Sequence, residues 1–254
     1  MNPPAIDLGI LWPALAAGLL VTATHVPLGI QVLQRGIVFI DLAVAQIAGL
    51  GVVVADALGF EPQGAAVQIS ALAAALAGAL LLHWTERRWP EVQEAVIGVA
   101  FVLAANAAIL LLAANPHGAE HLKDLLIGQI LWVRPEALAW VALVYAVVLA
   151  LWFPLGERIG RIGFYLLFAC AVTISVQQVG LYLVFATLIV PALATRRFAR
   201  ARLAAGYGLG ALGYLSGLAL SLATDLPPGP LIVCAMTALG LATFALGSRA
   251  RGSG

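Results

Sequence analysis

Nine long apolar segments constrain the fold of this chain more than any other feature. They are residues 9–33, 36–58, 65–84, 95–114, 137–154, 163–177, 180–194, 203–223 and 229–247. A helix needs about 20 apolar residues to cross the hydrocarbon core of a bilayer. Helices satisfy every backbone group within one segment, and the segments lack the period-two alternation of barrel strands. We therefore predict an all-α polytopic membrane protein with about nine transmembrane helices, forming a single transmembrane domain over residues 1–254.

The charged residues are few, and their positions predict the orientation. Only 10% of the 254 residues are charged and the formal net charge is +1, which excludes a basic face for nucleic acid. If the nine segments alternate across the membrane, most arginines fall on one side, which the positive-inside rule assigns to the cytoplasm. The N-terminus is then outside and the C-terminus cytoplasmic. This count requires that residues 125–132, too few to cross, form a re-entrant or interfacial segment on the outer side.

Asp41 is the first candidate functional residue because it is a single acid within the apolar run 36–58. A carboxylate inside a membrane is costly, so it is expected to face a cavity, a partner or a bound cation. His25, two residues before Pro27 in the first segment, has two interpretations. It forms a hydrogen bond to neighbouring backbone, or it faces Asp41 across a helix pair.

The sequence HGAEHLKD on the predicted outer side holds a second candidate group, made of His117, Glu120, His121 and Asp124. His117 and His121 with Glu120 match H-x-x-E-H, the inverted zinc-protease pattern. Pro116 and Gly118 disfavour the regular helix that this pattern needs. The group is therefore interpreted as a polar outer loop, or as a mouth that attracts cations.

Five local patterns, in order, resemble one family of membrane proteins. They are LGIQVLQRGIVFID (28–41), QEAVIGVAF (93–101), LLIGQILWVRPEAL (125–138), VGLYLVFATLIVPALATRR (179–197) and DLPPGP (225–230). In this order and spacing they are similar to the membrane permease subunit of ABC importers for divalent metals of the zinc, manganese and iron type. The resemblance covers most of the chain.

This resemblance implies a homodimer in the bacterial cytoplasmic membrane that works with two other kinds of subunit. One is a cytoplasmic ABC ATPase, and the other is an extracytoplasmic metal-binding protein that delivers Zn(II), Mn(II) or Fe(II). The divalent metal is then a transported substrate, and no permanently bound cofactor is expected. The sequence contains no G-x-x-x-x-G-K-[ST] motif of its own, so we predict a transport subunit and not an enzyme.

The resemblance also assigns residues to roles. In the family, a His follows the Asp of the second helix by four residues, so that both face one side; here that position is Ala45. Gln46 is the next polar candidate, and an amide oxygen suits a harder cation than zinc. The stretch 154–164 occupies the place of the family's ATPase-docking segment, although it is shorter. The coupling residues implied are Gly156, Glu157, Arg158, Gly160 and Arg161.

Two other classes of function stay open at this point. An ATP-independent secondary transporter or exporter of a small solute would use Asp41 and His25 as a proton relay. An intramembrane metalloenzyme would use His117 and His121. An ATPase that copurifies with the chain favours the permease, whereas transport driven by a proton gradient alone favours the secondary transporter.

Overall fold

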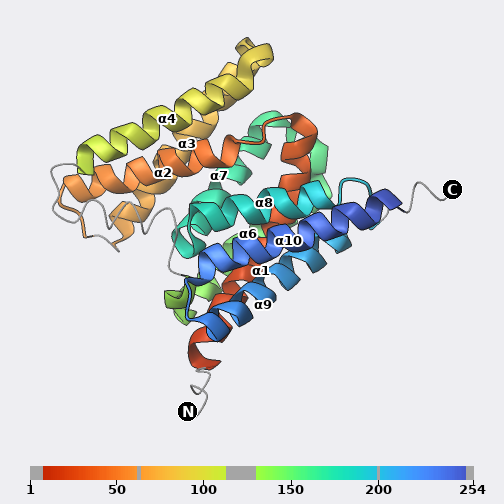
Figure 1. Cartoon of the computed structure of the whole chain (residues 1–254). Helices are drawn as coiled ribbons and strands as arrows, with labels where there is room; N and C mark the ends of the chain where they lie inside the picture. Colours follow the sequence, from red (N-terminus) through yellow and green to blue (C-terminus); the bar gives the residue numbers. More distant parts are fainter. Residues whose placement is uncertain (1–7, 62–63, 113–129, 199–200, 250–254) are drawn as a thin grey trace. The chain divides into compact units, whose positions relative to one another are not determined.

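The computed structural model describes residues 8–61, 64–112, 130–198 and 201–249, and within them every regular element is helical (Figure 1). The helices are α1 (Leu8–Arg35), α2 (Ile40–Ala57), α3 (Ala65–Arg88), α4 (Gln93–Leu112), α6 (Pro135–Leu155), α7 (Gly160–Val179), α8 (Leu181–Ala194), α9 (Arg202–Thr224) and α10 (Pro228–Arg249). Three short 3-10 turns are η1 (Pro90–Val92), η2 (Ile130–Trp132) and η3 (Gly156–Ile159). All nine apolar segments are helices, so the predicted fold class is confirmed.

The helix α8 differs from the others in length. In the described part of the chain, eight helices are long and apolar enough to cross a membrane, whereas α8 has 14 residues. At about 1.5 Å per residue it extends roughly 21 Å, less than the ~30 Å of the hydrocarbon core. Most of its side chains are buried, so protein packing fixes its position. The orientation inferred from the arginines needs α8 to cross, and it stays a prediction.

Two predicted features lie largely outside the described residues. Of the segment 125–132, only Ile130–Trp132 is described, as the turn η2. The outer group His117, Glu120, His121 and Asp124 falls wholly outside.

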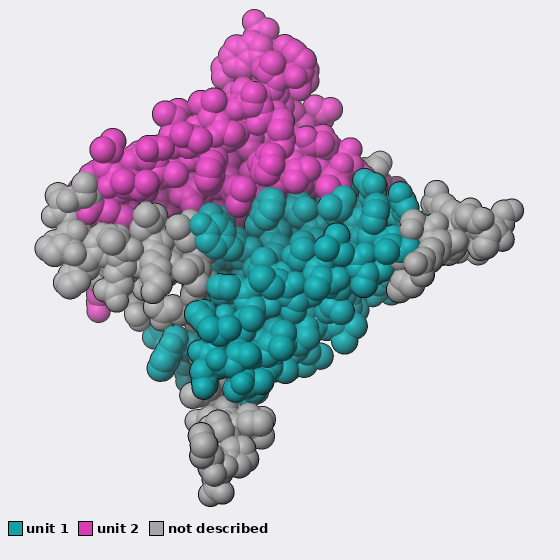
Figure 2. All heavy atoms as spheres, viewed as in Figure 1, with its two compact units in different colours: residues 1–31, 127–146, 178–254 teal, residues 32–126, 147–177 magenta. Residues whose placement is uncertain are grey.

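The chain divides into two compact units, which Figure 2 colours separately. The first unit is Met1–Gln31, Ile127–Ala146 and Gln178–Gly254, and the second is Val32–Leu126 and Val147–Gln177. The first unit therefore holds most of α1 together with α8, α9 and α10. The second holds α2, α3, α4 and most of α7. The single transmembrane domain inferred from the sequence stays a prediction.

Glycines on α9 allow close helix packing in the first unit. A Cβ at Gly206 would lie 2.7 Å from Val26, and one at Gly210 would lie 2.6 Å from Thr22, both on α1. Four residues apart, these glycines share one face of α9. Gly213 and Gly217, further along the same side of α9, approach α10 in the same way. Small residues at such spacing let membrane helices approach until their backbones nearly touch.

One of the two prolines inside α1, Pro27, leaves a carbonyl free that has a partner on another helix. Pro27 lies inside α1 and cannot donate to the carbonyl of Ala23. The hydroxyl of Tyr207 on α9 donates to that carbonyl at 3.2 Å. The break is therefore tolerated because a neighbouring helix replaces the missing hydrogen bond.

Close packing also joins α2 to α3 in the second unit. A Cβ at Gly51 would lie 2.8 Å from both the carbonyl oxygen of Ser70 and the Cβ of Ala74. The Ser70 hydroxyl donates to the Gly51 carbonyl at 2.8 Å. Further along, Gly78 of α3 accommodates the side chain of Ile47. Thus α2, the helix that carries Asp41, is held directly against α3.

Candidate functional site

Asp41 lies in the first turn of α2, directly after a tight connection from α1. Gly36, with φ of 71°, allows the chain to leave α1 in a conformation that other residues rarely adopt. Ile40 then begins α2, and Asp41 follows in its first turn. The positive end of the helix dipole favours a negative charge at this position. Local backbone geometry alone therefore supports a carboxylate here.

The Asp41 carboxylate is buried and incompletely satisfied. The residue has 0% exposure. Amides of its own turn, those of Asp41 and Leu42, lie near the carboxylate. Within the described residues, however, neither oxygen makes a well-aligned hydrogen bond. A buried carboxylate without such partners has an unsatisfied requirement for a donor or a cation.

Two buried alanines follow Asp41 on its side of α2. Ala45 and Ala48 are 3% and 4% exposed and follow Asp41 by four and seven residues. They therefore lie on the same side of the helix. Gln46 is half-buried and, at about 100° per residue, its direction differs from that of Asp41 by about 140°. The pairing of Asp41 with Gln46 stays a prediction.

His25 is fully buried in α1 and presents one free ring nitrogen. Its Nδ1 lies 3.0 Å from the Val21 carbonyl oxygen and 3.0 Å from the Thr24 hydroxyl. Because a carbonyl only accepts, a hydrogen bond with Val21 requires the proton on Nδ1 and leaves a lone pair on Nε2. Nε2 is buried with no hydrogen-bond partner among the described residues. The predicted hydrogen bond to neighbouring backbone therefore accounts for Nδ1 of His25. Its Nε2 keeps the capacity to bind a cation.

Glu94, in the first turn of α4, is a second carboxylate near the beginning of α2, and the sequence interpretation did not select it. Its Oε1 accepts a hydrogen bond of 3.3 Å from the backbone N–H of Phe39, two residues before Asp41. Its Oε2 is buried with no hydrogen-bond partner in the described part of the chain. Glu94 lies in one of the five recognised sequence patterns, QEAVIGVAF, and this was the available signal.

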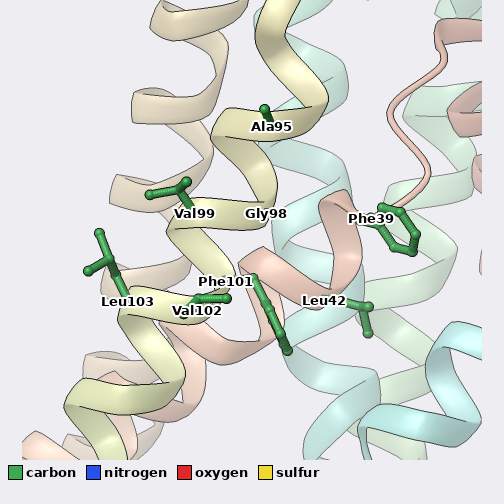
Figure 3. A pocket seen from close by; sticks show the side chains of 8 residues that line it. All are labelled: Phe39, Leu42, Ala95, Gly98, Val99, Phe101, Val102 and Leu103. Atoms are coloured by element: carbon green, nitrogen blue, oxygen red, sulfur yellow. The ribbon is translucent and has the colours of Figure 1, made fainter.

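An apolar cavity of about 600 Å³ lies between α2 and α4, but it is not the Asp41 site (Figure 3). Phe39, which directly precedes α2, and Leu42 of α2 line it together with Gly98, Val99 and Val102 of α4. Asp41 lies between Phe39 and Leu42 in sequence and is therefore rotated by 100° or more from both. Because the lining is hydrocarbon, this cavity offers a cation no ligands.

A preformed site for a tightly held metal is not found in the described ranges. Among residues 8–61, 64–112, 130–198 and 201–249, no three His, Cys, Asp or Glu side chains are grouped to hold a metal ion. Asp41 belongs to the second unit and His25 to the first.

The predicted coupling segment forms the turn η3 and the start of α7. Gly156 and Glu157 lie in η3, and Gly160 begins α7 with φ of 71°. Arg158 and Arg161 are exposed. Arg161 also forms an ion pair of 3.6 Å with Glu86 at the end of α3. The segment is thus joined to the helix that packs against α2.

Glu86 is the centre of a polar cluster that the sequence interpretation missed. It is 8% exposed, and the Nδ1 atom of His83 lies 4.0 Å from its carboxylate. The His83 ring makes an edge contact with Tyr165 of α7, with 5.6 Å between ring centroids. His83 therefore belongs to this cluster.

Comparison with known proteins decides the family. The model of the family described as "ABC 3 transport family" matches residues 7–159 and 155–247, nearly the whole chain. The chain belongs to the ABC 3 transport family. The resemblance inferred from the five sequence patterns is confirmed, and so is the role of a transport subunit in the membrane.

Two relatives and one solved structure are similar over most of their length. ZnuB, the high-affinity zinc uptake system membrane protein of Haemophilus influenzae, is 24% identical and covers 92% of this chain and 97% of its own. YfeC, the chelated iron transport system membrane protein of Yersinia pestis, is 30% identical and covers 76% of this chain and 71% of its own. The structure of PsaBC from Streptococcus pneumoniae in complex with Fab matches with a TM-score of 0.77 at 20% identity, covering 94% of this chain and 92% of the other. That likeness supports the fold.

Proposed function

We propose that this member of the ABC 3 transport family is the permease subunit of an importer for a divalent metal ion, Zn(II), Mn(II) or Fe(II). The ion passes Asp41 as a transient ligand. The single observation that carries the proposal is the Asp41 carboxylate, which is 0% exposed within a membrane helix and lacks a well-aligned hydrogen bond in the described residues. A divalent cation supplies the positive charge that balances such a buried carboxylate. The relatives named for zinc and for chelated iron support the same class of cargo.

His25 is the second ligand that we propose along the path. Its Nε2 carries a lone pair in the tautomer that the Val21 carbonyl favours, and imidazole binds zinc and iron well. The family has a His at the position of Ala45, and His25 would supply a nitrogen ligand in its place from another helix. Gln46 would add an amide oxygen if the helix rotates during transport. Weak ligands of this kind suit an ion that must leave again.

The energy comes from a separate subunit in this proposal. A cytoplasmic ABC ATPase docks on the segment formed by Gly156, Glu157, Arg158, Gly160 and Arg161. Two copies of the chain form the pathway, and an extracytoplasmic metal-binding protein delivers the ion from outside. The arrangement needs the N-terminus outside and the C-terminus in the cytoplasm of a bacterial membrane. The outer residues His117, Glu120, His121 and Asp124 would then attract cations at the mouth.

Reconstitution tests the proposal directly. The chain and its ATPase are placed in liposomes with the metal-binding protein, and uptake of Zn(II), Mn(II) and Fe(II) is measured with ATP and with a non-hydrolysable analogue. We expect uptake of at least one of the three ions, and only with ATP. Uptake driven by a proton gradient without ATP would contradict the proposal and favour the secondary transporter. Comparison of the three ions under competition identifies the cargo.

A further inference from the structure

A second groove, in the first unit, differs from the α2–α4 cavity because it has a charged rim. It lies between α8 and α10 and encloses about 390 Å³. On α10 its lining is Thr237, Leu241 and Phe244, which recur at helical spacing and so face one side. On α8 it is lined by Val190 and Leu193. The two helices approach closely because Gly240 leaves room for Val190, whose Cγ1 would lie 2.7 Å from an added Cβ.

Two guanidinium groups meet at the end of this groove. The Cζ of Arg196 lies 5.1 Å from the centroid of the Phe244 ring, and that of Arg197 lies 4.5 Å from the same centroid. Stacking on one ring orients both cations at the rim. Arg196 is exposed, and none of the ion pairs within the described residues involves it. Two positive charges close to one aromatic ring attract an anion to this end of the groove.

The groove continues from this rim into the apolar part of α10. From Phe244 to Thr237 is two turns, or about 10 Å along the helix axis. Its walls there are hydrocarbon except for the Thr237 hydroxyl, which already donates to the Val233 carbonyl at 2.7 Å. The walls therefore match an alkyl chain, and the rim matches an anionic group.

The geometry points to a binding site for an anionic phospholipid between α8 and α10, with its phosphate at Arg196 and Arg197 and one acyl chain along Val190, Leu193 and Leu241. The site lies at the end of the helices that the arginine distribution assigns to the cytoplasm, where the negatively charged leaflet supplies such lipids. A soluble protein partner would meet the arginines but would not reach the apolar walls two turns deeper. No charged residue lines the α2–α4 cavity, so nothing in its lining would select one lipid headgroup over another.

Native mass spectrometry in detergent tests this site, with the full chain purified alone and also together with its ATPase subunit. Dioleoyl phosphatidylglycerol, which is anionic, and dioleoyl phosphatidylethanolamine, which is zwitterionic, are titrated separately, so that the acyl chains are the same and the headgroups differ. Arg196→Ala combined with Arg197→Ala should weaken phosphatidylglycerol binding by about twenty-fivefold, at about fivefold for each guanidinium, and should weaken phosphatidylethanolamine binding much less, because the ammonium of that lipid offsets its phosphate.

The control is Arg87→Ala with Arg88→Ala, another arginine pair on the same predicted side, where Arg88 lies 5.7 Å from the Trp89 ring centroid. Neither of those arginines lines a described groove, and we expect less than a twofold change.

A second variant tests the acyl part without touching the charges. Leu241 is 67% exposed, so Leu241→Trp fills the groove with little risk to folding. This variant should bind one phosphatidylglycerol fewer although both arginines remain. Glycerol phosphate, which has the headgroup without acyl chains, should not compete with phosphatidylglycerol for the unmodified protein.

Three results would overturn the inference: equal binding of the two lipids, equal losses in the test and control pairs, or loss of the ATPase subunit from the arginine variant with lipid binding unchanged. The last result would assign the arginines to a protein interface. None of these measurements depends on which ion is transported.

Discussion

Removing Arg161 should disturb the protein more than removing its partner Glu86. The pair joins the predicted coupling segment to the end of α3, with 3.6 Å between Nη1 of Arg161 and Oε1 of Glu86. The Arg161 side chain is 59% exposed, whereas that of Glu86 is 10% exposed. Arg161→Ala leaves a nearly buried carboxylate next to the Tyr165 hydroxyl and to His83, which is 4.0 Å away, with no full positive charge from Arg161 to balance it. Glu86→Gln leaves an arginine that water can solvate.

The size of the effect follows from the distance and the exposure. At 3.6 Å and an effective dielectric constant of about 20, the direct attraction is roughly 4 to 5 kcal/mol. Water around the exposed Arg161 and the cost of fixing its side chain offset most of this. Exposed pairs contribute about 0.2 to 1 kcal/mol, and the burial of Glu86 favours the upper end. We therefore expect about 1 kcal/mol, which corresponds to a factor of about five in an equilibrium constant.

A double-mutant cycle measures this directly. Arg161→Ala, Glu86→Gln and the double variant are compared by unfolding in mixed micelles with increasing SDS. Arg161→Ala should be the less stable single variant, and Glu86→Gln should restore most of its loss because it removes the stranded charge. In liposomes with the ATPase, Arg161→Ala should also lower the number of ions transported per ATP, and Arg161→Lys should recover part of this ratio.

Arg158→Ala is the matched control, since Arg158 is exposed in the same segment and forms no ion pair with a described residue. Equal losses of stability in Arg158→Ala and Arg161→Ala, or no rescue of stability by Glu86→Gln, would refute the reasoning. A loss of stability with an unchanged ratio of ions to ATP would leave the pair a structural role only.

Two further predictions concern backbone contacts, with the free energy of unfolding as the measurement. Gly51→Val should cost about 1 to 3 kcal/mol because a Cβ there would lie 2.8 Å from the Ser70 carbonyl oxygen. Gly208→Ala, where nothing lies within 4 Å of an added Cβ, should be neutral or stabilising by up to about 1 kcal/mol, and equal effects at these positions would contradict the packing described. Gly180→Ala should cost about 1 to 3 kcal/mol because Gly180, between α7 and α8, has φ of 84° and ψ of 159°. A cost below about 0.3 kcal/mol would show that this turn adopts another conformation.

The helices were predictable because hydrophobicity is a local property of the sequence. Every apolar segment longer than about 20 residues is a helix, since a membrane leaves the backbone few alternatives. Asp41 could be selected for the same reason, as an acid in such a segment is costly wherever the helix packs. The burial of its carboxylate follows from tertiary packing.

The contacts between helices could not be predicted in this way. The Phe39 amide and the Glu94 carboxylate meet across 55 residues of sequence, and Tyr207 reaches the Ala23 carbonyl across 184. No periodicity specifies such pairs, because they depend on which faces of the helices meet. Glu86 was missed for this reason: in the sequence it is one acid before two arginines at the end of an apolar run.

The most direct test of the central claim is the initial rate of ATP-dependent metal uptake by Asp41→Asn. Asparagine keeps the size of the side chain and removes the charge that a passing cation needs. Asp56→Asn, at the other end of α2, is the control for the loss of one acid from the same helix. The account predicts that Asp41→Asn loses most uptake while Asp56→Asn retains it, with both proteins equally abundant in the membrane. Uptake by Asp41→Asn at the rate of the unmodified protein would contradict it.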